Sequence, residues 1–89
     1  MEPDFVIVKK PVDSESPDSL VAEIELPGIS SQAEIMLDIG EDRLVCETKS
    51  KKDNYFMDIF VPYRLDQDEC TAQFNREKHL LTVTMQVVS

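Results

Sequence analysis

The sequence is poor in the residue types that mark many enzymes and metalloproteins. Its 89 residues include no tryptophan, two glycines, two cysteines (Cys46 and Cys70) and one histidine, His79. Two glycines cannot build a glycine-rich phosphate loop, and a calcium loop would need regularly alternating carboxylates that are missing here. The cysteines and the histidine show neither the spacing of a structural zinc site nor a local Cys-His catalytic motif. We therefore expect no catalytic residues, no metal site, no cofactor and no enzymatic activity.

Long apolar runs are also missing. No stretch approaches the roughly 20 apolar residues of a membrane-spanning helix, and no signal peptide opens the chain. There is no N-x-S/T glycosylation sequon, which together with the missing secretory signal favours a reducing compartment and free thiols. We expect the cytoplasm, with the nucleus as a second compartment. The alternative is a secreted domain with a Cys46–Cys70 disulfide, which two free thiols would exclude.

Basic residues are outnumbered two to one. Eighteen acidic against nine basic residues give a formal net charge of −9. A negative field of this size repels phosphate backbones and anionic lipid surfaces, so we expect neither nucleic acid nor membrane as a partner. It attracts basic peptides. For any single carboxylate, the simpler interpretation is that it keeps a small domain soluble.

What the sequence does contain is a series of short strand-like runs separated by turn signals. Alternating apolar residues, ended by pairs such as Pro27-Gly28, predict seven strands. Their expected bounds are Phe5–Lys9, Leu20–Leu26, Glu34–Ile39, Arg43–Thr48, Tyr55–Val61, Cys70–Asn75 and His79–Val88. Residues 30–34 allow at most one helical turn, residues 63–69 an acidic loop, and residues 13–18 a solvated acidic loop whose serines could accept phosphate. The pattern predicts an all-β domain, a seven-stranded antiparallel β-sandwich.

We expect one domain over residues 1–89, with the first strand and the acidic loop in 1–19 and the sandwich body in 20–88. The immunoglobulin type of sandwich is disfavoured, because it needs a tryptophan between paired cysteines. Lys9, Lys10 and Pro11 are typical of an edge strand guarded against self-association.

The run from Tyr55 to Val61 is the most informative of the seven. Side chains of a strand alternate between faces, so Tyr55, Met57, Ile59 and Val61 share one side. The other side is left with Phe56, Asp58 and Phe60. If the neighbouring strands follow the same parity, four apolar residues lie on one outer face: Met36, Val45, Phe56 and Phe60. We interpret them as a partner-binding patch. Two alternatives remain open: one parity assignment is wrong, or the loop Lys49–Asn54 folds over the patch.

An ordered set of short motifs extends this interpretation. The motifs are Leu26-Pro27-Gly28, Gly40-Glu41-Asp42-Arg43-Leu44, Asp58-Ile59-Phe60-Val61-Pro62, Ala72-x-Phe74 and Leu81-x-Val83-x-Met85. Together they resemble the C-terminal CS-like domain of PIH-family co-chaperone adaptors, over about residues 20–85. Gln86 departs from the pattern, since family members often carry proline just after the last strand. The resemblance implies a sandwich of the type found in CS domains, small co-chaperones and α-crystallins.

The resemblance also implies a function. PIH proteins use this domain to hold a tetratricopeptide-repeat (TPR) co-chaperone through an extended segment outside that partner's repeats. The pair links the ninety-kilodalton heat-shock chaperone to RuvB-like AAA+ ATPases and assists the assembly of large complexes. We therefore expect a domain that is monomeric alone and binds the segment by strand addition. The alternative is a holdase that binds unfolded chains, as small heat-shock proteins do.

Overall fold

The computed structural model describes residues 2–10, 17–49 and 54–88. They form seven strands and one turn of 3-10 helix. The strands are β1 (Phe5–Lys10), β2 (Ser19–Glu25), β3 (Ile35–Ile39), β4 (Arg43–Thr48), β5 (Phe56–Phe60), β6 (Leu65–Asn75) and β7 (Leu80–Val87), with the helical turn η1 (Gln32–Glu34) before β3. The guard residue Pro11, residues 13–16 of the expected acidic loop and residues 50–53 of the expected covering loop lie outside the described residues.

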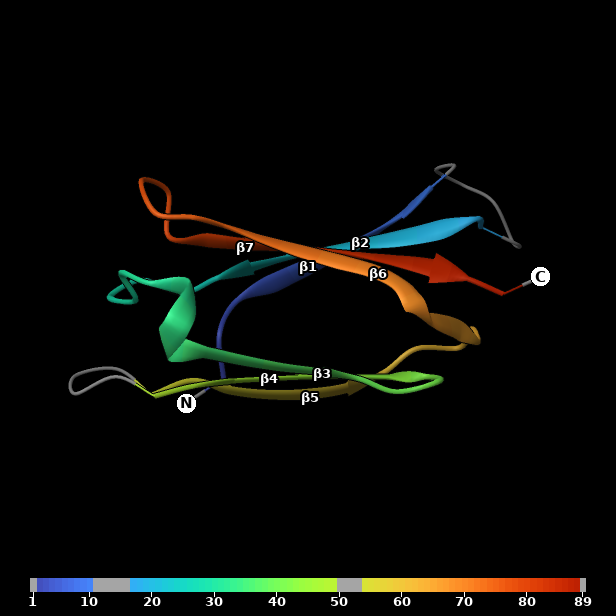
Figure 1. Ribbon diagram of the computed structural model, residues 1–89, viewed down its shortest axis with the longest axis horizontal. Coiled ribbons are helices and arrows are strands. Elements are labelled where there is room, and N and C mark those ends of the chain that lie inside the picture. The colour runs from blue at the N-terminus through green and yellow to red at the C-terminus, as the bar shows by residue number, and fades with distance from the viewer. Residues whose placement is uncertain (1, 11–16, 50–53, 89) are drawn as a thin grey trace.

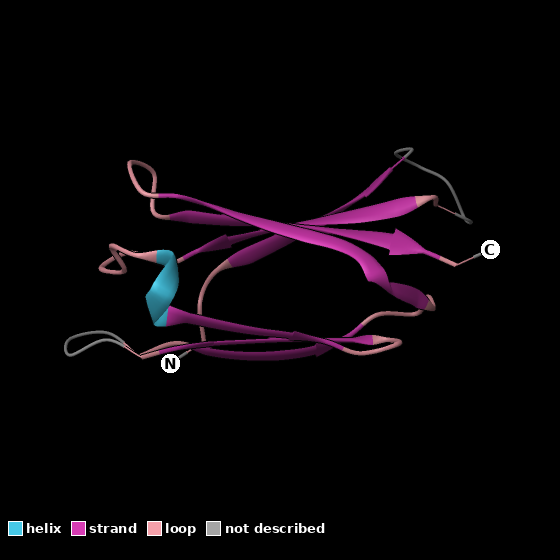
Figure 2. Ribbon diagram, in the orientation of Figure 1, coloured by secondary structure: helices cyan, strands magenta, loops and turns pink. Residues whose placement is uncertain are grey.

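The strands pack as two layers (Figure 1). One sheet has the order β1-β2-β7-β6 and the other β3-β4-β5, and neighbouring strands are antiparallel throughout. Figure 2 shows η1 between the two layers at one end of the sandwich. The predicted all-β, seven-stranded antiparallel sandwich is confirmed. In the described part of the chain no helix is long and apolar enough to cross a membrane.

The core lies between the sheets and is supplied by alternate residues of each strand. Those of the central strands are almost completely buried, because other strands cover them on both sides. The buried set is Leu20, Ala22, Ile24, Leu26, Ile29, Leu44, Cys46, Tyr55, Met57, Val61, Leu65, Leu81, Val83 and Met85. On the edge strands burial varies: Met57 and Leu65 are buried, whereas Leu37 and Phe74 are only half-buried. The strand parity expected from the sequence therefore holds in the core.

One loop prediction is wrong. Residues 65–69 belong to the long strand β6, where the sequence indicated an acidic loop from residue 63 to residue 69. The pairing of β6 with β7 shifts register between Asp66 and Thr71, and the bulge between them is polar. Within it, the Asp68 N–H donates to Asp66 Oδ1 (3.1 Å) and the Cys70 thiol donates to the Asp66 carbonyl (3.1 Å). The bulge interrupts the period-two pattern, which is why the sequence did not reveal this part of the strand.

Two turns at one end of the sandwich are tied together. His79 precedes β7 with a φ of 53°, in the left-handed region, and its carbonyl accepts from the Leu26 N–H (2.8 Å). Its ring Nδ1 lies 2.8 Å from the Ile29 carbonyl, and since a carbonyl only accepts, Nδ1 is the protonated nitrogen. Tyr55 donates its hydroxyl to the Pro27 carbonyl (2.6 Å). The β2–η1 connection is thus fastened to both sheets.

Candidate functional site

The outer face of the sheet β3-β4-β5 carries all four residues expected to bind a partner. Leu44, Cys46 and Met57 are fully buried, so their neighbours along β4 and β5 point away from the core. Met36 is 51% exposed, Phe56 51% and Phe60 70%, while Val45 is half-buried. We call this surface the outer face; its members are Met36, Asp38, Arg43, Val45, Glu47, Phe56, Asp58 and Phe60.

The strand register shows that the outer face is not a continuous apolar patch. Glu47 lies between Met36 and Phe56 in one cross-strand row, and Val45 lies between Asp38 and Asp58 in the next. Arg43 is directly opposite Phe60. Val45 is a diagonal neighbour of the three exposed apolar residues, at the roughly 7–8 Å typical of such pairs. The four residues share a face as predicted, but charged side chains alternate with them.

Arg43 organises one end of the outer face. Its Nε donates to Asp58 Oδ1 (2.7 Å) and its Nη2 donates to Asp58 Oδ2, a bidentate pair. The guanidinium carbon also lies 5.5 Å from the centre of the Phe60 ring, within the range of a cation–π contact. One side chain therefore positions both an exposed aromatic ring and a carboxylate. Sequence analysis did not single out Arg43; its place at the outward parity of β4 was the available signal.

The ion pair shifts the pKa values of Arg43 and Asp58 in the directions that favour their charged forms. The hydrogen bond to Asp58 raises the pKa of Arg43, with smaller contributions from Asp38 and Asp42, and the same bond lowers the pKa of Asp58. Because the pKa of Asp58 is lower in the folded state, the ion pair stabilises the fold at any pH above the ordinary pKa of a carboxyl group. This stabilisation is lost as the pH falls through the lowered pKa. Asp58 is therefore charged at neutral pH. Three carboxylates (Asp38, Glu47 and Asp58) and one guanidinium (Arg43) give the outer face a formal charge of −2.

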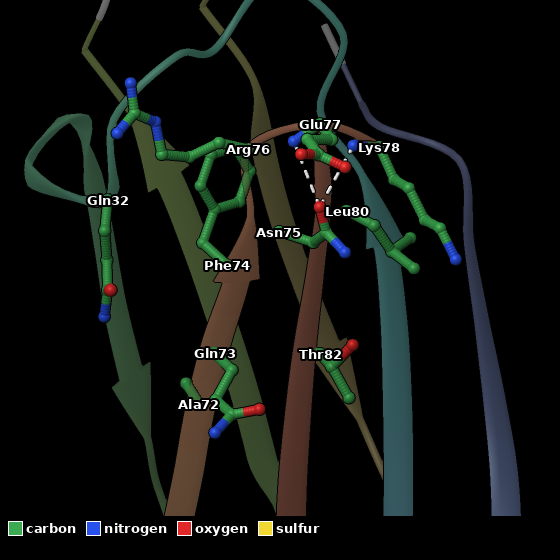
Figure 3. A pocket seen from close by; sticks show the side chains of 10 residues that line it. All are labelled: Gln32, Ala72, Gln73, Phe74, Asn75, Arg76, Glu77, Lys78, Leu80 and Thr82. Carbon is green, nitrogen blue, oxygen red and sulfur yellow. Dashed lines mark hydrogen bonds between the residues drawn. The ribbon is translucent and has the colours of Figure 1, made fainter.

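A second surface feature is an open hollow of about 780 Å³ beside the turn between β6 and β7 (Figure 3). In this turn the Asn75 side-chain oxygen accepts from the backbone N–H groups of Glu77 (3.0 Å) and Lys78 (3.2 Å). Figure 3 shows the side chains of Arg76 and Lys78 extending in different directions rather than converging on one point. The two basic side chains therefore do not form a common binding point in this hollow.

The residues with reactive side chains are placed apart. Cys46 is buried between the sheets, and burial raises the pKa of its thiol to about 11. Cys70 lies in the bulge of β6, where burial also raises its pKa, and both thiols are free. His79 is held beyond the end of β6 by the Ile29 carbonyl. Among residues 2–10, 17–49 and 54–88, no three His, Cys, Asp or Glu side chains are grouped to hold a metal ion.

Comparisons of the sequence with known proteins show the family to which this chain belongs. Residues 3–88 match the model of the PIH1 CS-like domain. The chain is 45% identical to PIH1 domain-containing protein 1 of Xenopus laevis, over 96% of this chain and 28% of that protein. It is 42% identical to the protein of the same name in Danio rerio (98% and 29%) and 36% identical to human PIH1 domain-containing protein 2 (84% and 23%). The chain thus spans less than a third of the length of these relatives.

A solved structure agrees on the fold. Heat shock protein 16.0 from Schizosaccharomyces pombe superimposes with a TM-score of 0.75, covering 100% of this chain and 89% of that one at 20% sequence identity. At that identity the likeness shows a shared sandwich and carries no function across. The family match and the relatives, by contrast, rest on sequence over nearly the whole chain. They confirm the resemblance seen in the motifs, and the chain belongs to the PIH1 CS-like domain family.

Proposed function

We propose that this domain is the partner-holding part of a co-chaperone adaptor. It captures an extended segment of a TPR co-chaperone by strand addition, and Met36, Val45, Phe56 and Phe60 contact that segment. Through the captured protein, the adaptor links the ninety-kilodalton heat-shock chaperone to RuvB-like AAA+ ATPases. Its place of work is the cytoplasm, with the nucleus as a second compartment, and its chemistry is binding rather than catalysis.

The observation that supports this function is the exposure of three large apolar side chains on one small sheet. Half or more of Met36, Phe56 and Phe60 is accessible. Exposing them has a free-energy cost that a partner would remove, at about 25 cal/mol for each Å² of apolar surface covered. Aromatic side chains are also enriched among the residues that dominate binding energy at protein interfaces. Phe60, the most exposed and held by Arg43, is the expected anchor.

The mixed character of the outer face argues for a selected partner. Because apolar side chains alternate with carboxylates here, the face should bind most tightly a segment that supplies both apolar and basic groups. A holdase needs broad apolar contact with many unfolded chains. The adaptor is therefore the first candidate and the holdase the second.

The test is the affinity of Phe60→Ser for a recombinant TPR co-chaperone that includes the segment outside its repeats. We expect binding at least tenfold weaker, since an anchor aromatic accounts for about 1.4 kcal/mol or more. The control is Val6→Ser, because Val6 is 60% exposed but lies on the other sheet. Unchanged affinity of a folded Phe60→Ser, or an equal loss in Val6→Ser, would refute a role for the outer face.

Stoichiometry separates the two candidates. The adaptor should be a monomer alone and form a one-to-one complex with the TPR protein, as measured by light scattering after gel filtration. A holdase should oligomerise and suppress the aggregation of unrelated heated proteins. Suppression of aggregation without a one-to-one complex would reject the adaptor.

A further inference from the structure

At the four sheet edges, the backbone N–H and C=O groups that face away from the sheet belong to outward-facing residues on β5 and to inward-facing residues on the other three strands. At the residues that flank β5, the Val61 N–H donates to the Asp42 carbonyl (2.8 Å) and the Tyr55 carbonyl accepts from the Thr48 N–H (3.0 Å). Odd-numbered residues of this strand therefore bond to β4, given the antiparallel register. Phe56, Asp58 and Phe60 turn their N–H and C=O groups toward the free edge. In the described chain none of these six groups makes a hydrogen bond.

The other three edge strands have the opposite arrangement. On β3, the Gly40 N–H donates to the Arg43 carbonyl (2.8 Å), which leaves the odd-numbered residues facing the free edge. The same reasoning applies to β1, from the bond between the Glu25 N–H and the Asp4 carbonyl (2.8 Å), and to the regular half of β6. The free-edge residues there turn their side chains toward the core: Ile35, Leu37 and Ile39; Phe5 and Ile7; Ala72 and Phe74.

This difference gives β5 a property that the other described edges lack. A strand added to β5 would pair directly with Phe56, Asp58 and Phe60, so its paired side chains would lie on the outer face beside the exposed phenylalanines. A strand added to β1, β3 or the regular half of β6 would form its hydrogen-bonded pairs with inward-facing residues, and only its non-hydrogen-bonded residues would lie on an outer face. The outer face and a free set of backbone groups thus coincide at β5.

Resting on the proposed function, we infer that the partner segment adds to the free edge of β5 and has the pattern apolar-x-basic-x-apolar. The two apolar residues lie beside Phe56 and Phe60, and the basic residue lies opposite Asp58. The pattern reads the same in both directions, so it holds for parallel and antiparallel addition.

Charge complementarity supports the basic residue. The position opposite Asp58 continues the row formed by Asp38, Val45 and Asp58, which contains two carboxylates. Arg43 pairs with Asp58 from the adjacent row, and the outer face still keeps its net negative charge because Asp38 and Glu47 remain. A lysine or arginine placed there meets acidic side chains within reach of its long stem. An acidic residue would face Asp58 directly, and like charges in directly opposed cross-strand positions are destabilising.

The same carboxylate argues against a second copy of this chain as the occupant. If two β5 edges paired antiparallel in the register of greatest overlap, Phe56 would meet Phe60 of the other copy and Asp58 would meet its own equivalent. That contact brings two carboxylates together at the centre of a five-residue strand. A basic partner segment avoids the repulsion.

The first experiment uses a synthetic nonapeptide with valine at the first and fifth core positions, lysine at the third and threonine between them. Its affinity for this chain is measured by NMR titration. We expect shifts centred on β5 and at least tenfold weaker binding when the lysine is replaced by glutamate. Alternate backbone N–H groups of the bound peptide face β5, and the others face away from it. N-methylation of the set that faces β5 should abolish binding, while N-methylation of the other set should leave the affinity within about twofold.

The second experiment blocks the edge in the protein. Asp58→Pro removes an N–H that faces the free edge, so it sacrifices no ladder bond to β4. Lys9→Pro is the matched control, since Lys9 is exposed and its N–H faces the free edge of β1. We expect Asp58→Pro to lose peptide binding and Lys9→Pro to keep it. Asp58→Asn retains the N–H and should lose mainly the preference for lysine over glutamate; it decides the matter if Asp58→Pro does not fold.

The outcomes separate this inference from the proposed function. If the TPR co-chaperone binds and is weakened by Lys9→Pro but not by changes at Asp58, the adaptor function stands and the β5 assignment falls. If the peptide binds β5 as described but no TPR co-chaperone binds, the edge assignment stands and the proposed partner falls. Shifts spread over other edges, or equal affinity for the lysine and glutamate peptides, overturn the inference.

Discussion

Replacing Tyr55 with phenylalanine tests how the two sheets are fastened together. The Tyr55 side chain is 7% exposed, lies in the core and donates its hydroxyl to the Pro27 carbonyl (2.6 Å). Tyr55→Phe keeps the ring and removes this hydrogen bond between the start of β5 and the turn after β2. Packing should therefore stay intact while one link between the layers is lost.

The size of the effect follows from the surroundings of the acceptor. Pro27 is exposed, so its carbonyl can bond to water once the hydroxyl is gone. The loss is then the net value of one hydrogen bond, about 1 kcal/mol in the free energy of unfolding, rather than the larger penalty of a buried unpaired group. For a domain of this size it corresponds to a fall of about 4–8 °C in Tm, measured by circular dichroism during heating.

Tyr63→Phe is the matched control. Tyr63 packs against the same core, but its hydroxyl makes no hydrogen bond to the described residues. We expect its Tm to stay within about 2 °C of the parent, in line with a change of a few tenths of a kcal/mol. Equal shifts in the two variants, or no shift in Tyr55→Phe, would refute the assignment of this stability to the Tyr55–Pro27 bond.

Two further predictions concern the thiols and the histidine turn. Burial raises the pKa of Cys46 from 9.0 to about 11, so roughly one thiolate per thousand is present at pH 8. A thiol reagent at pH 8 should label Cys70 in the folded protein and Cys46 only on unfolding. The stability due to the neutral Cys46 thiol is complete below pH 9.0, and it is lost as the pH rises through about 11. Rapid labelling of Cys46 in the native state would contradict its burial. At His79, alanine and glycine both lose the bond to the Ile29 carbonyl, but only glycine accepts a φ of 53° without strain. His79→Gly should be more stable than His79→Ala by about 1 kcal/mol in urea unfolding; the reverse order would show that the strain is not felt.

Much of the fold follows from the sequence because a strand has a period of two. Leu20, Ala22 and Ile24 alternate with exposed or half-buried neighbours, and the structure buries them as expected. The bounds of β4 agree with the prediction, and most other strand ends differ by about one residue. Strand β6 is the exception, since its bulge breaks the alternation and its acidic side chains imitate a loop.

The sequence alone placed Met36, Val45, Phe56 and Phe60 on one face, because parity is a local property of each strand. It could not place Arg43 against both Asp58 and Phe60, since residues 15 and 17 positions apart meet only through the β4–β5 register. The same parity puts Asp38, Glu47 and Asp58 on that face, but their positions between the apolar residues in the cross-strand rows depend on the register. Which backbone groups remain free at each edge also depends on the partner strand, and tertiary pairing alone decided that β5 combines a free edge with an exposed aromatic face.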